Sequence, residues 1–224
     1  MRTFITVVFL TACSGPQSAE QGQADFLRSG VLGSAGQADA VDLLFVVHDG
    51  PTMADVQGRL GRAGADLADA LEGVDARVYV ITTSSPTPVA RFTTTEDDFE
   101  DAWADAVQVG VDRAALGQGL RTALSALTGG QVAVRGDAFL SLVHVSDEPE
   151  ESPGEPESYV RGIEGDRPEA TALHALVGLP DAPCGEVEVG EGYLEAAEAS
   201  GGLALDVCAA DYGPALARVV EASQ

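Results

Sequence analysis

The chain has 224 residues, enough for one medium-sized α/β domain, and 45% of them are hydrophobic, so it can bury a core. Its 36 acidic and 12 basic residues give a formal net charge of -24, and every basic residue is an arginine. A surface this acidic repels phosphate backbones, which argues against nucleic acid as a partner and leaves cations and basic partners.

Residues 1–12 have the pattern of a very short secretory signal peptide. Arg2 supplies the positive charge, and residues 5–10 form an apolar segment that is too short to cross a membrane as a helix. The segment ends in Leu-Thr-Ala-Cys, which resembles the lipobox of bacterial lipoproteins and implies cleavage before Cys13 and lipidation of its thiol. An ordinary signal peptide followed by a chance cysteine is the alternative. Because Ser14 follows the cysteine, where the inner-membrane retention signal has Asp, the resemblance implies a lipid-anchored protein of the cell envelope, at the outer membrane of a two-membrane cell.

The rest of the chain divides into a tether and a folded part. Residues 13–40, from the lipidated cysteine onward, are rich in Gly, Ser, Gln and Ala and predict a flexible tether, so the folded domain is expected in residues 41–224. After cleavage the domain keeps Cys184 and Cys208. Cysteines of exported chains usually pair, so we expect a disulfide that closes a loop of roughly 25 residues, with two buried free thiols as the alternative.

The folded part opens with residues 41–47, which are almost entirely apolar and predict a strand buried on both faces of a parallel sheet. Residues 48–53 follow as a polar turn. Apolar residues spaced by three and four then predict a helix over residues 52–71, with Thr52 as its N-cap. Ligand sites in open α/β sheets lie at the carboxyl ends of the strands, so the turn at 48–53 is the first candidate site.

Strand and helix patterns alternate through the remainder of the chain. Further strands are predicted at residues 77–83, 91–95, 139–145, 171–178 and 203–207. Helices are predicted at residues 95–106, 114–127, 156–162, 192–200 and 211–222, with a short extended piece at 107–111. This order predicts an α/β fold of three layers, Rossmann-like, in which helices cover both faces of a mainly parallel central sheet.

Several segments resemble the von Willebrand factor A (vWA) domain, in its lipoprotein form from myxobacteria and their relatives. They are the opening strand with its turn up to Met53, the helix at 114–127, the strand that leads into Ser146-Asp147-Glu148, and Gly201-Gly202 followed by Cys208. The resemblance covers nearly all of the folded part and implies a vWA fold. It also implies a metal-ion-dependent adhesion site, where oxygens from three strand-end loops and from a partner surround a divalent cation.

The metal-binding residues of that family are poorly kept. The family's two Asp, two Ser and one Thr positions fall, in chain order, on His48, Gly50, Thr52, Val111 and Asp147. Only Asp147 is unchanged and Thr52 keeps a hydroxyl, so these two remain as candidate metal ligands. We expect a degenerate site with no resident cofactor, or one that binds Mg²⁺ or Ca²⁺ weakly. A functional site is the alternative, with Asp49 as a substitute ligand or a transition metal on His48.

The candidate binding residues lie in the same loops. They are His48, Asp49, Thr52, Asp112, Asp147 and Glu148. The acidic residues 147–157 are a second candidate cation site, but their spacing matches no EF-hand loop and a solvated loop is the favoured interpretation.

Catalysis has little support in the sequence. It contains neither a Gly-x-Ser-x-Gly elbow nor a His-Glu-x-x-His pair, and His144 and His174 lie in apolar strands, where core positions are expected. We therefore expect no enzyme, but a lipid-anchored binding or adhesion module. Its partner would be an unknown protein or surface polymer, and its only contact with the membrane would be the lipid. The alternatives are an envelope hydrolase, in which His48, Asp49 and Asp147 converge in one deep pocket, and an inert structural lipoprotein.

Overall fold

A computed structural model describes residues 40–95, 98–112 and 115–224 of the chain, so the predicted signal peptide, Cys13 and almost all of the tether lie outside the described residues. Within these residues the strands form one six-stranded sheet in the order β3-β2-β1-β4-β5-β6. The strands are β1 (Ala40–Val47), β2 (Asp75–Thr82), β3 (Ala90–Thr93), β4 (Phe139–Val145), β5 (Thr171–Val177) and β6 (Ala204–Asp206). All neighbours pair in parallel except β3, which runs antiparallel to β2 at one edge.

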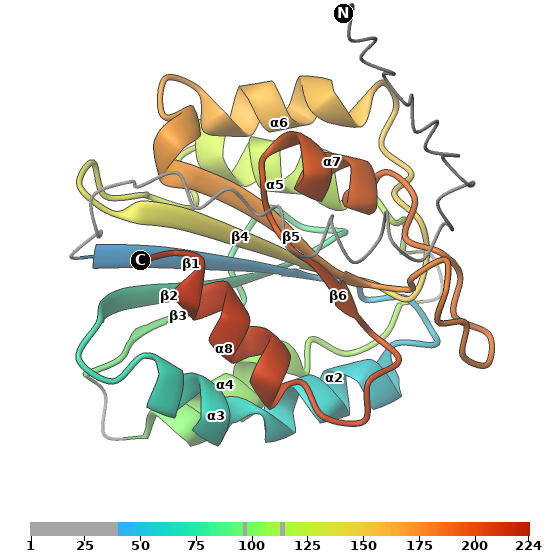
Figure 1. Cartoon of the computed structure of the whole chain (residues 1–224), viewed down its shortest axis with the longest axis horizontal. Helices are drawn as coiled ribbons and strands as arrows, with labels where there is room; N and C mark the ends of the chain where they lie inside the picture. The colour runs from blue at the N-terminus through green and yellow to red at the C-terminus, as the bar shows by residue number, and fades with distance from the viewer. Residues whose placement is uncertain (1–39, 96–97, 113–114) are drawn as a thin grey trace, which may run out of the picture. The chain divides into compact units, whose positions relative to one another are not determined.

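Helices cover both faces of this sheet, as Figure 1 shows. The α-helices of the described residues are α2 (Ala54–Arg62), α3 (Gly64–Ala70), α4 (Phe99–Val107), α5 (Gly119–Thr128), α6 (Pro156–Glu164), α7 (Tyr193–Ala199) and α8 (Gly213–Glu221), with a short 3₁₀ turn η1 (Pro168–Ala170) before β5. Helices α2, α3, α4 and α8 pack on one face, and α5, α6 and α7 on the other. The predicted three-layer α/β fold is confirmed.

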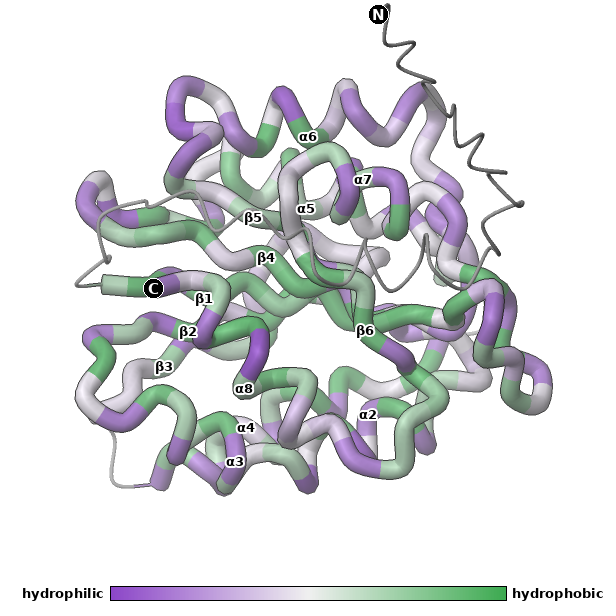
Figure 2. The backbone as a smooth tube through the Cα atoms, viewed as in Figure 1, coloured by the Kyte–Doolittle hydropathy of each residue, from purple (hydrophilic) through white to green (hydrophobic). Residues whose placement is uncertain are grey.

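Strand β1 lies in the middle of the sheet, between β2 and β4. Its eight residues are all buried. Phe45 packs in the layer of α2 and α4, whereas Leu44 and Val46 pack in the layer of α5 and α6. Both faces of the strand are therefore covered, which explains its continuous apolar sequence. Figure 2 shows the same hydrophobic character along the central strands.

Two helix predictions were wrong in their detail. The helix expected over residues 52–71 is two helices, α2 and α3, which meet at Ala63. At the start of α3 a Cβ atom on Gly64 would lie 2.8 Å from Cδ1 of Trp103, so close packing against α4 constrains the chain there. The N-cap of α2 is Met53 rather than Thr52, and no side chain caps it.

The segment between α4 and α5 also differs from its prediction. Helix α4 runs through Val107, and the described residues from 108 to 118 form neither the predicted extended piece nor the first turns of α5, which begins at Gly119. The start of α5 is set by contacts with the loop that follows β4, about 30 residues away in sequence. These contacts leave no signal in the local sequence.

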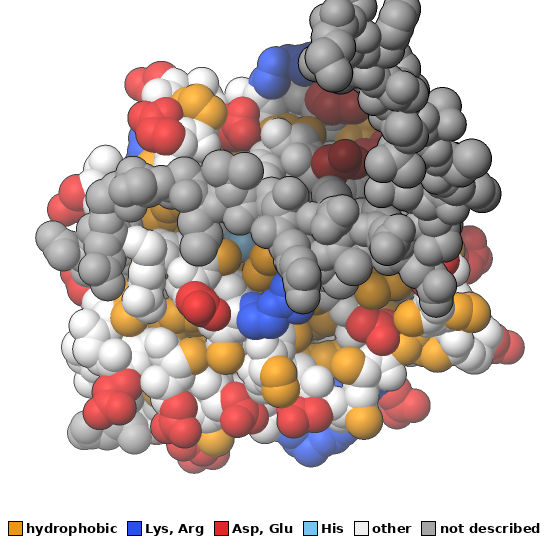
Figure 3. Space-filling view, in the orientation of Figure 1, with side chains coloured by type: hydrophobic (Ala, Val, Ile, Leu, Met, Phe, Trp, Pro, Cys, Tyr) orange, Lys and Arg blue, Asp and Glu red, His pale blue; other side chains and the backbone are white. Residues whose placement is uncertain are grey.

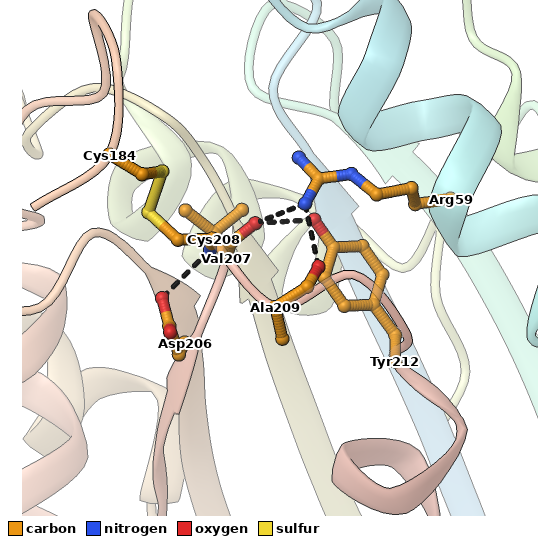
Figure 4. The surroundings of a disulfide bond; sticks show 7 residues. All are labelled: Arg59, Cys184, Asp206, Val207, Cys208, Ala209 and Tyr212. Carbon is orange, nitrogen blue, oxygen red and sulfur yellow. Dashed lines mark hydrogen bonds between the residues drawn. A yellow bond between two sulfur atoms is a disulfide. The ribbon is translucent and has the colours of Figure 1, made fainter. Parts of the chain in front are cut away.

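The predicted disulfide joins Cys184 to Cys208, which are 24 residues apart. Beside it, Arg59 of α2 donates from Nη1 to the carbonyl oxygens of Val207 and Ala209, at 2.9 and 2.7 Å, as Figure 4 shows. The Tyr212 hydroxyl also donates to Val207, at 2.6 Å. These bonds fix the connection from β6 to α8 against α2. Among the described residues, no helix combines the length and the apolar composition needed to span a membrane.

Candidate functional site

Four segments meet at the carboxyl edge of the sheet. The His48 amide donates to the Val145 carbonyl (2.9 Å), and the Thr83 amide donates to the Val47 carbonyl (3.2 Å), so the ends of β4, β1 and β2 stay side by side. The Asp112 amide donates to the Asp49 carbonyl (2.6 Å) and brings in the segment between α4 and α5. This edge is where ligands bind in open α/β sheets, and it carries all six predicted binding residues.

The His48 side chain is fully buried and faces the loop after β4. Its Nδ1 lies 3.1 Å from Ser146 Oγ. The Ser146 hydroxyl already donates its hydrogen to the Glu148 carbonyl (2.8 Å), so the hydrogen of the His48 contact comes from Nδ1.

Buried polar atoms without partners gather beside this imidazole. His48 Nε2 and Asp147 Oδ1 make no hydrogen bond within the described part of the chain. Asp147 Oδ1 is 3.6 Å from His48 Nδ1, and Glu148 Oε2 is 3.8 Å from Nε2. Buried polar atoms are normally paired, so an unpaired group at a strand end calls for a functional explanation. The structure therefore brings three predicted site residues, His48, Asp147 and Glu148, together.

The His48 ring leaves room only for glycine at position 50. A Cβ atom on Gly50 would lie 2.6 Å from Nε2 of His48 and 2.8 Å from Cε1, closer than van der Waals contact permits. The ring thus covers the place where a side chain at position 50 would begin. His48 and Gly50 thus form one packing arrangement, because the histidine at 48 requires the glycine at 50.

Asp49 faces the end of β2, whereas His48 faces the loop after β4. Its Oδ1 accepts hydrogen bonds from the hydroxyls of Thr83 (3.0 Å) and Ser84 (2.9 Å), which follow β2. Successive side chains of an extended segment point in opposite directions, which separates Asp49 from His48. The structure does not bring Asp49 together with His48 and Asp147 as the hydrolase alternative requires.

The remaining predicted ligands do not complete a cage of oxygens. Thr52 is exposed at the start of the α2 turn, and Val111, at the position of the family's Thr, is 52% exposed with an apolar side chain. Asp112 is exposed and held through its backbone. Across the described residues, no group of three or more His, Cys, Asp or Glu side chains is placed to hold a metal ion.

Gln57 is a site residue that the sequence reasoning missed. Its buried amide nitrogen donates to the carbonyls of His48 (3.2 Å) and Gly110 (2.8 Å), which ties the end of β1 to the loop before α5. A signal was present in the sequence, because Gln57 is a polar residue on the apolar face of α2, one turn from Met53 and next to Val56.

The acidic loop after β4 caps helix α5. Glu150 accepts from the Leu120 amide (2.9 Å) and from Ser152 (2.7 Å), and Glu151 accepts from the Gly117 amide (3.0 Å). Burial raises the pKa of Glu150 despite these bonds. Amides at a helix amino terminus lack partners within the helix, and these carboxylates supply them. These two carboxylates therefore stabilise the start of α5, and the candidate cation site at residues 147–157 stays a prediction.

Two buried histidines extend inward from this edge. His144 and His174 lie inside the sheet, as expected for core residues, and burial lowers their pKa values to about 3 and about 4. The His144 ring packs on Tyr193 with 4.8 Å between the ring centroids. The Tyr193 hydroxyl accepts from the Gly119 amide and donates to the Gly117 carbonyl, so it supports the start of α5.

Comparisons with known proteins identify the fold to which this sheet belongs. Neither a protein-family model nor a curated protein matches the chain. A solved structure of a von Willebrand factor type A protein from Catenulispora acidiphila is similar, with a TM-score of 0.55 and 11% identity over 82% of this chain and 43% of that one. The pilus adhesin SpaC from Lactobacillus rhamnosus GG gives a TM-score of 0.52 and 13% identity over 81% of this chain and 30% of that one.

The third similar structure is proximal thread matrix protein 1 from the mussel byssus, with a TM-score of 0.47 and 12% identity over 82% of this chain and 47% of that one. The chain thus spans less than half the length of each of these proteins. At such identities the likeness concerns the fold and not the activity. The sheet order, the antiparallel edge strand and the first two of these similarities together show that the chain has a von Willebrand factor A-like fold.

Proposed function

We propose that this chain is a lipid-anchored binding module of the cell envelope, which engages another protein at the carboxyl edge of its sheet with weak or no dependence on metal. The single observation that carries the proposal is the buried His48 ring above Gly50, which fills the position where the vWA resemblance expects oxygen ligands. A similar fold occurs in a pilus adhesin, which supports a role in adhesion or protein interaction.

The loss of metal dependence follows from the donor set. A divalent Mg²⁺ or Ca²⁺ ion needs six or more oxygen ligands. Positions 48, 50 and 111 offer none from their side chains, and Thr52 and Asp147 would supply only two. We infer that the adhesion site is degenerate and that binding uses the protein surface around it.

The surface around this edge suits a protein partner. Three large hydrophobic side chains are exposed among the described residues, and two of them, Val111 and Leu116, lie in the loop before α5. Acidic side chains are scattered over the face seen in Figure 3, and basic ones are few, in keeping with the formal charge of -24. An apolar contact with an acidic surround favours a neutral or basic protein surface over nucleic acid.

Two other roles are less well supported. A hydrolase would need Asp49 to act with Asp147, but the Asp49 carboxylate is engaged by Thr83 and Ser84. An inert lipoprotein would leave the unpartnered atoms of His48 and Asp147 without a purpose. The anchor itself is proposed from the lipobox at Cys13, and mass spectrometry of the native protein would detect the lipid on that residue.

The metal question is tested by thermal melting with Mg²⁺, Mn²⁺ or Ca²⁺. We expect that adding any of these ions leaves the melting temperature of the native chain unchanged, and that of the Asp147→Ala variant as well. A rise of several degrees that Asp147→Ala abolishes would contradict the degenerate-site proposal, since ligand binding to the folded state raises its stability.

Partner capture tests the surface itself. Cell-envelope extracts are passed over the immobilised chain with and without EDTA, and bound proteins are identified. We expect a partner that resists EDTA and is lost with Val111→Asp and Leu116→Asp. Val89→Asp, at the exposed valine between β2 and β3, shows whether the contact extends along this edge beyond the loop before α5. Failure to capture any protein under either condition would favour the inert alternative.

A further inference from the structure

A second feature of this edge is a pocket of about 360 Å³ on the α5 side of Asp49. Its walls are the loop after β2, the residues just before α5 and the first turns of α5. Its volume is at the lower end of the range found for small-molecule sites, about 300 to 1,000 Å³. None of the residues assigned to the degenerate metal site lines it.

Four hydroxyl groups line the pocket, and each one donates its hydrogen to an internal acceptor. Thr83 and Ser84 donate to Asp49 Oδ1, Thr122 donates to the Thr83 carbonyl at 2.8 Å, and Ser125 donates to the Arg121 carbonyl at 2.8 Å. Carboxylates and carbonyls can only accept, so the hydrogens are committed to them. What the four oxygens can still offer to a ligand is their free lone pairs, and the ligand must donate.

The start of α5 also offers donors. Gln118 accepts from Arg121 Nη1 through its Oε1 (3.3 Å), so its amide nitrogen is left to donate. The other guanidinium N–H groups of Arg121 make no hydrogen bond within the described part of the chain and add further donors. A ligand must therefore both donate to the hydroxyl oxygens and accept from Gln118 and Arg121.

Charges of both signs lie around the pocket, so neither a cation nor an anion meets a uniformly attractive surface. Arg121 in its wall repels a cation. An anion would be repelled by two carboxylates. Asp49 lies behind the Thr83 and Ser84 hydroxyls, and the Glu151 carboxylate lies 3.0 Å from the amide of Gly117, which sits between two lining residues in sequence. The formal charge of -24 adds to the repulsion of an anion, whereas for a cation it opposes the local effect of Arg121. A neutral ligand escapes both effects.

We propose that this pocket binds a neutral sugar unit of a glycan. A sugar hydroxyl is both donor and acceptor, so one ring can donate to the serine and threonine oxygens and accept from Gln118 and Arg121. Leu116 and Pro86 complete the lining and offer apolar contact to the C–H groups of the ring. The site shares Leu116 with the apolar contact proposed for a protein partner, whereas its hydrogen-bonding residues lie outside that contact.

Saturation-transfer NMR on the full chain tests the proposal with glucose, galactose, mannose and N-acetylglucosamine as neutral probes. Glucuronate and glucosamine are the anionic and cationic comparisons. We expect transfer to at least one neutral sugar at millimolar concentration, and weaker transfer to both charged probes. Arg121→Ala and Gln118→Ala should each weaken binding by about tenfold, the effect of losing a hydrogen bond that involves a polar or charged donor.

A pocket-filling variant separates binding from folding. Ser125→Phe places a ring over the cavity from an exposed position on α5 and should abolish the signal while the melting temperature stays close to that of the native chain. Arg218→Ala, an exposed arginine on α8, is the matched control and should bind normally. No transfer to any neutral sugar, stronger transfer to a charged probe, or full binding by Ser125→Phe would overturn the proposal.

Discussion

The two ends of β1 differ in whether their buried polar groups are hydrogen-bonded. At the amino end, the buried Asp42 carboxylate accepts from the Arg135 amide (2.6 Å) and from Arg135 Nε (2.9 Å). Arg135 also pairs with Asp75 at 2.7 Å. At the carboxyl end, His48 Nε2 and Asp147 Oδ1 are buried without a hydrogen bond in the described residues. Because folding alone favours full pairing, the amino end is explained by stability, whereas the carboxyl end points to a role outside folding.

His144 provides the strongest test of this reasoning, since both of its ring nitrogens are buried and neither has a hydrogen-bond partner among the residues that the structure describes. Burial lowers its pKa from 6.5 to about 3, so the unfolded chain binds a proton more readily than the folded chain between these values. Stability should be complete above about pH 6.5 and fall as the pH drops toward 3. The loss due to this residue is on the order of 4 kcal/mol. His174, with a pKa of about 4, adds to it.

His144→Leu should remove that part of the pH dependence, measured by urea unfolding at steps between pH 7 and pH 4. The difference in unfolding free energy between the native chain and the variant is the quantity to follow, because titrating carboxylates affect both proteins equally. Ser141→Ala, a buried neighbour on β4 with an unpaired but non-titrating hydroxyl, is the control and should keep the native slope. An unchanged slope in His144→Leu would show that the imidazole is solvated or paired in solution.

The next largest effect concerns the ion pair between Arg135 and Asp42. Arg135→Ala leaves the Asp42 carboxylate buried without its partner and should lower the unfolding free energy by about 3 kcal/mol. Asp147→Ala, at the other end of the sheet, removes a carboxylate with one unpaired oxygen and should change it by less than about 1 kcal/mol. Denaturant unfolding of both variants at neutral pH gives the comparison directly. Equal losses would remove the distinction between the two ends.

The strands could be predicted from the sequence closely, and the helix boundaries less so. Long apolar runs predict β1 and β4 within a residue, because a strand covered on both faces needs no other signal. The break at Ala63 depends on Trp103, and the start of α5 depends on Glu150, and both partners lie at least 30 residues away in sequence. Local patterns carry no record of such tertiary contacts.

The candidate site shows the same limit. The sequence predicts that His48 and Gly50 stand where the vWA resemblance expects oxygen ligands, and this alignment stays a prediction. The contact between the two residues could not be read from the sequence, because it depends on the side-chain direction of His48 toward Ser146. The separation of Asp49 from Asp147 likewise depends on which neighbouring strand each side chain faces.

An effect smaller than that of Arg135→Ala tests whether His48 and Gly50 form one arrangement. Gly50→Ser introduces a Cβ atom 2.6 Å from His48 Nε2 and should destabilise the fold by about 2 kcal/mol through overpacking. His48→Ala in the same chain should recover most of that loss, because it removes the ring that the new side chain meets. Urea unfolding of the native chain, the two single variants and the double variant gives the coupling free energy, which we expect to be at least about 1 kcal/mol. Thr52→Ser, an exposed change two residues away, is the control and should be neutral. Additive single effects would mean that the glycine is needed for its backbone rather than to make room for the imidazole.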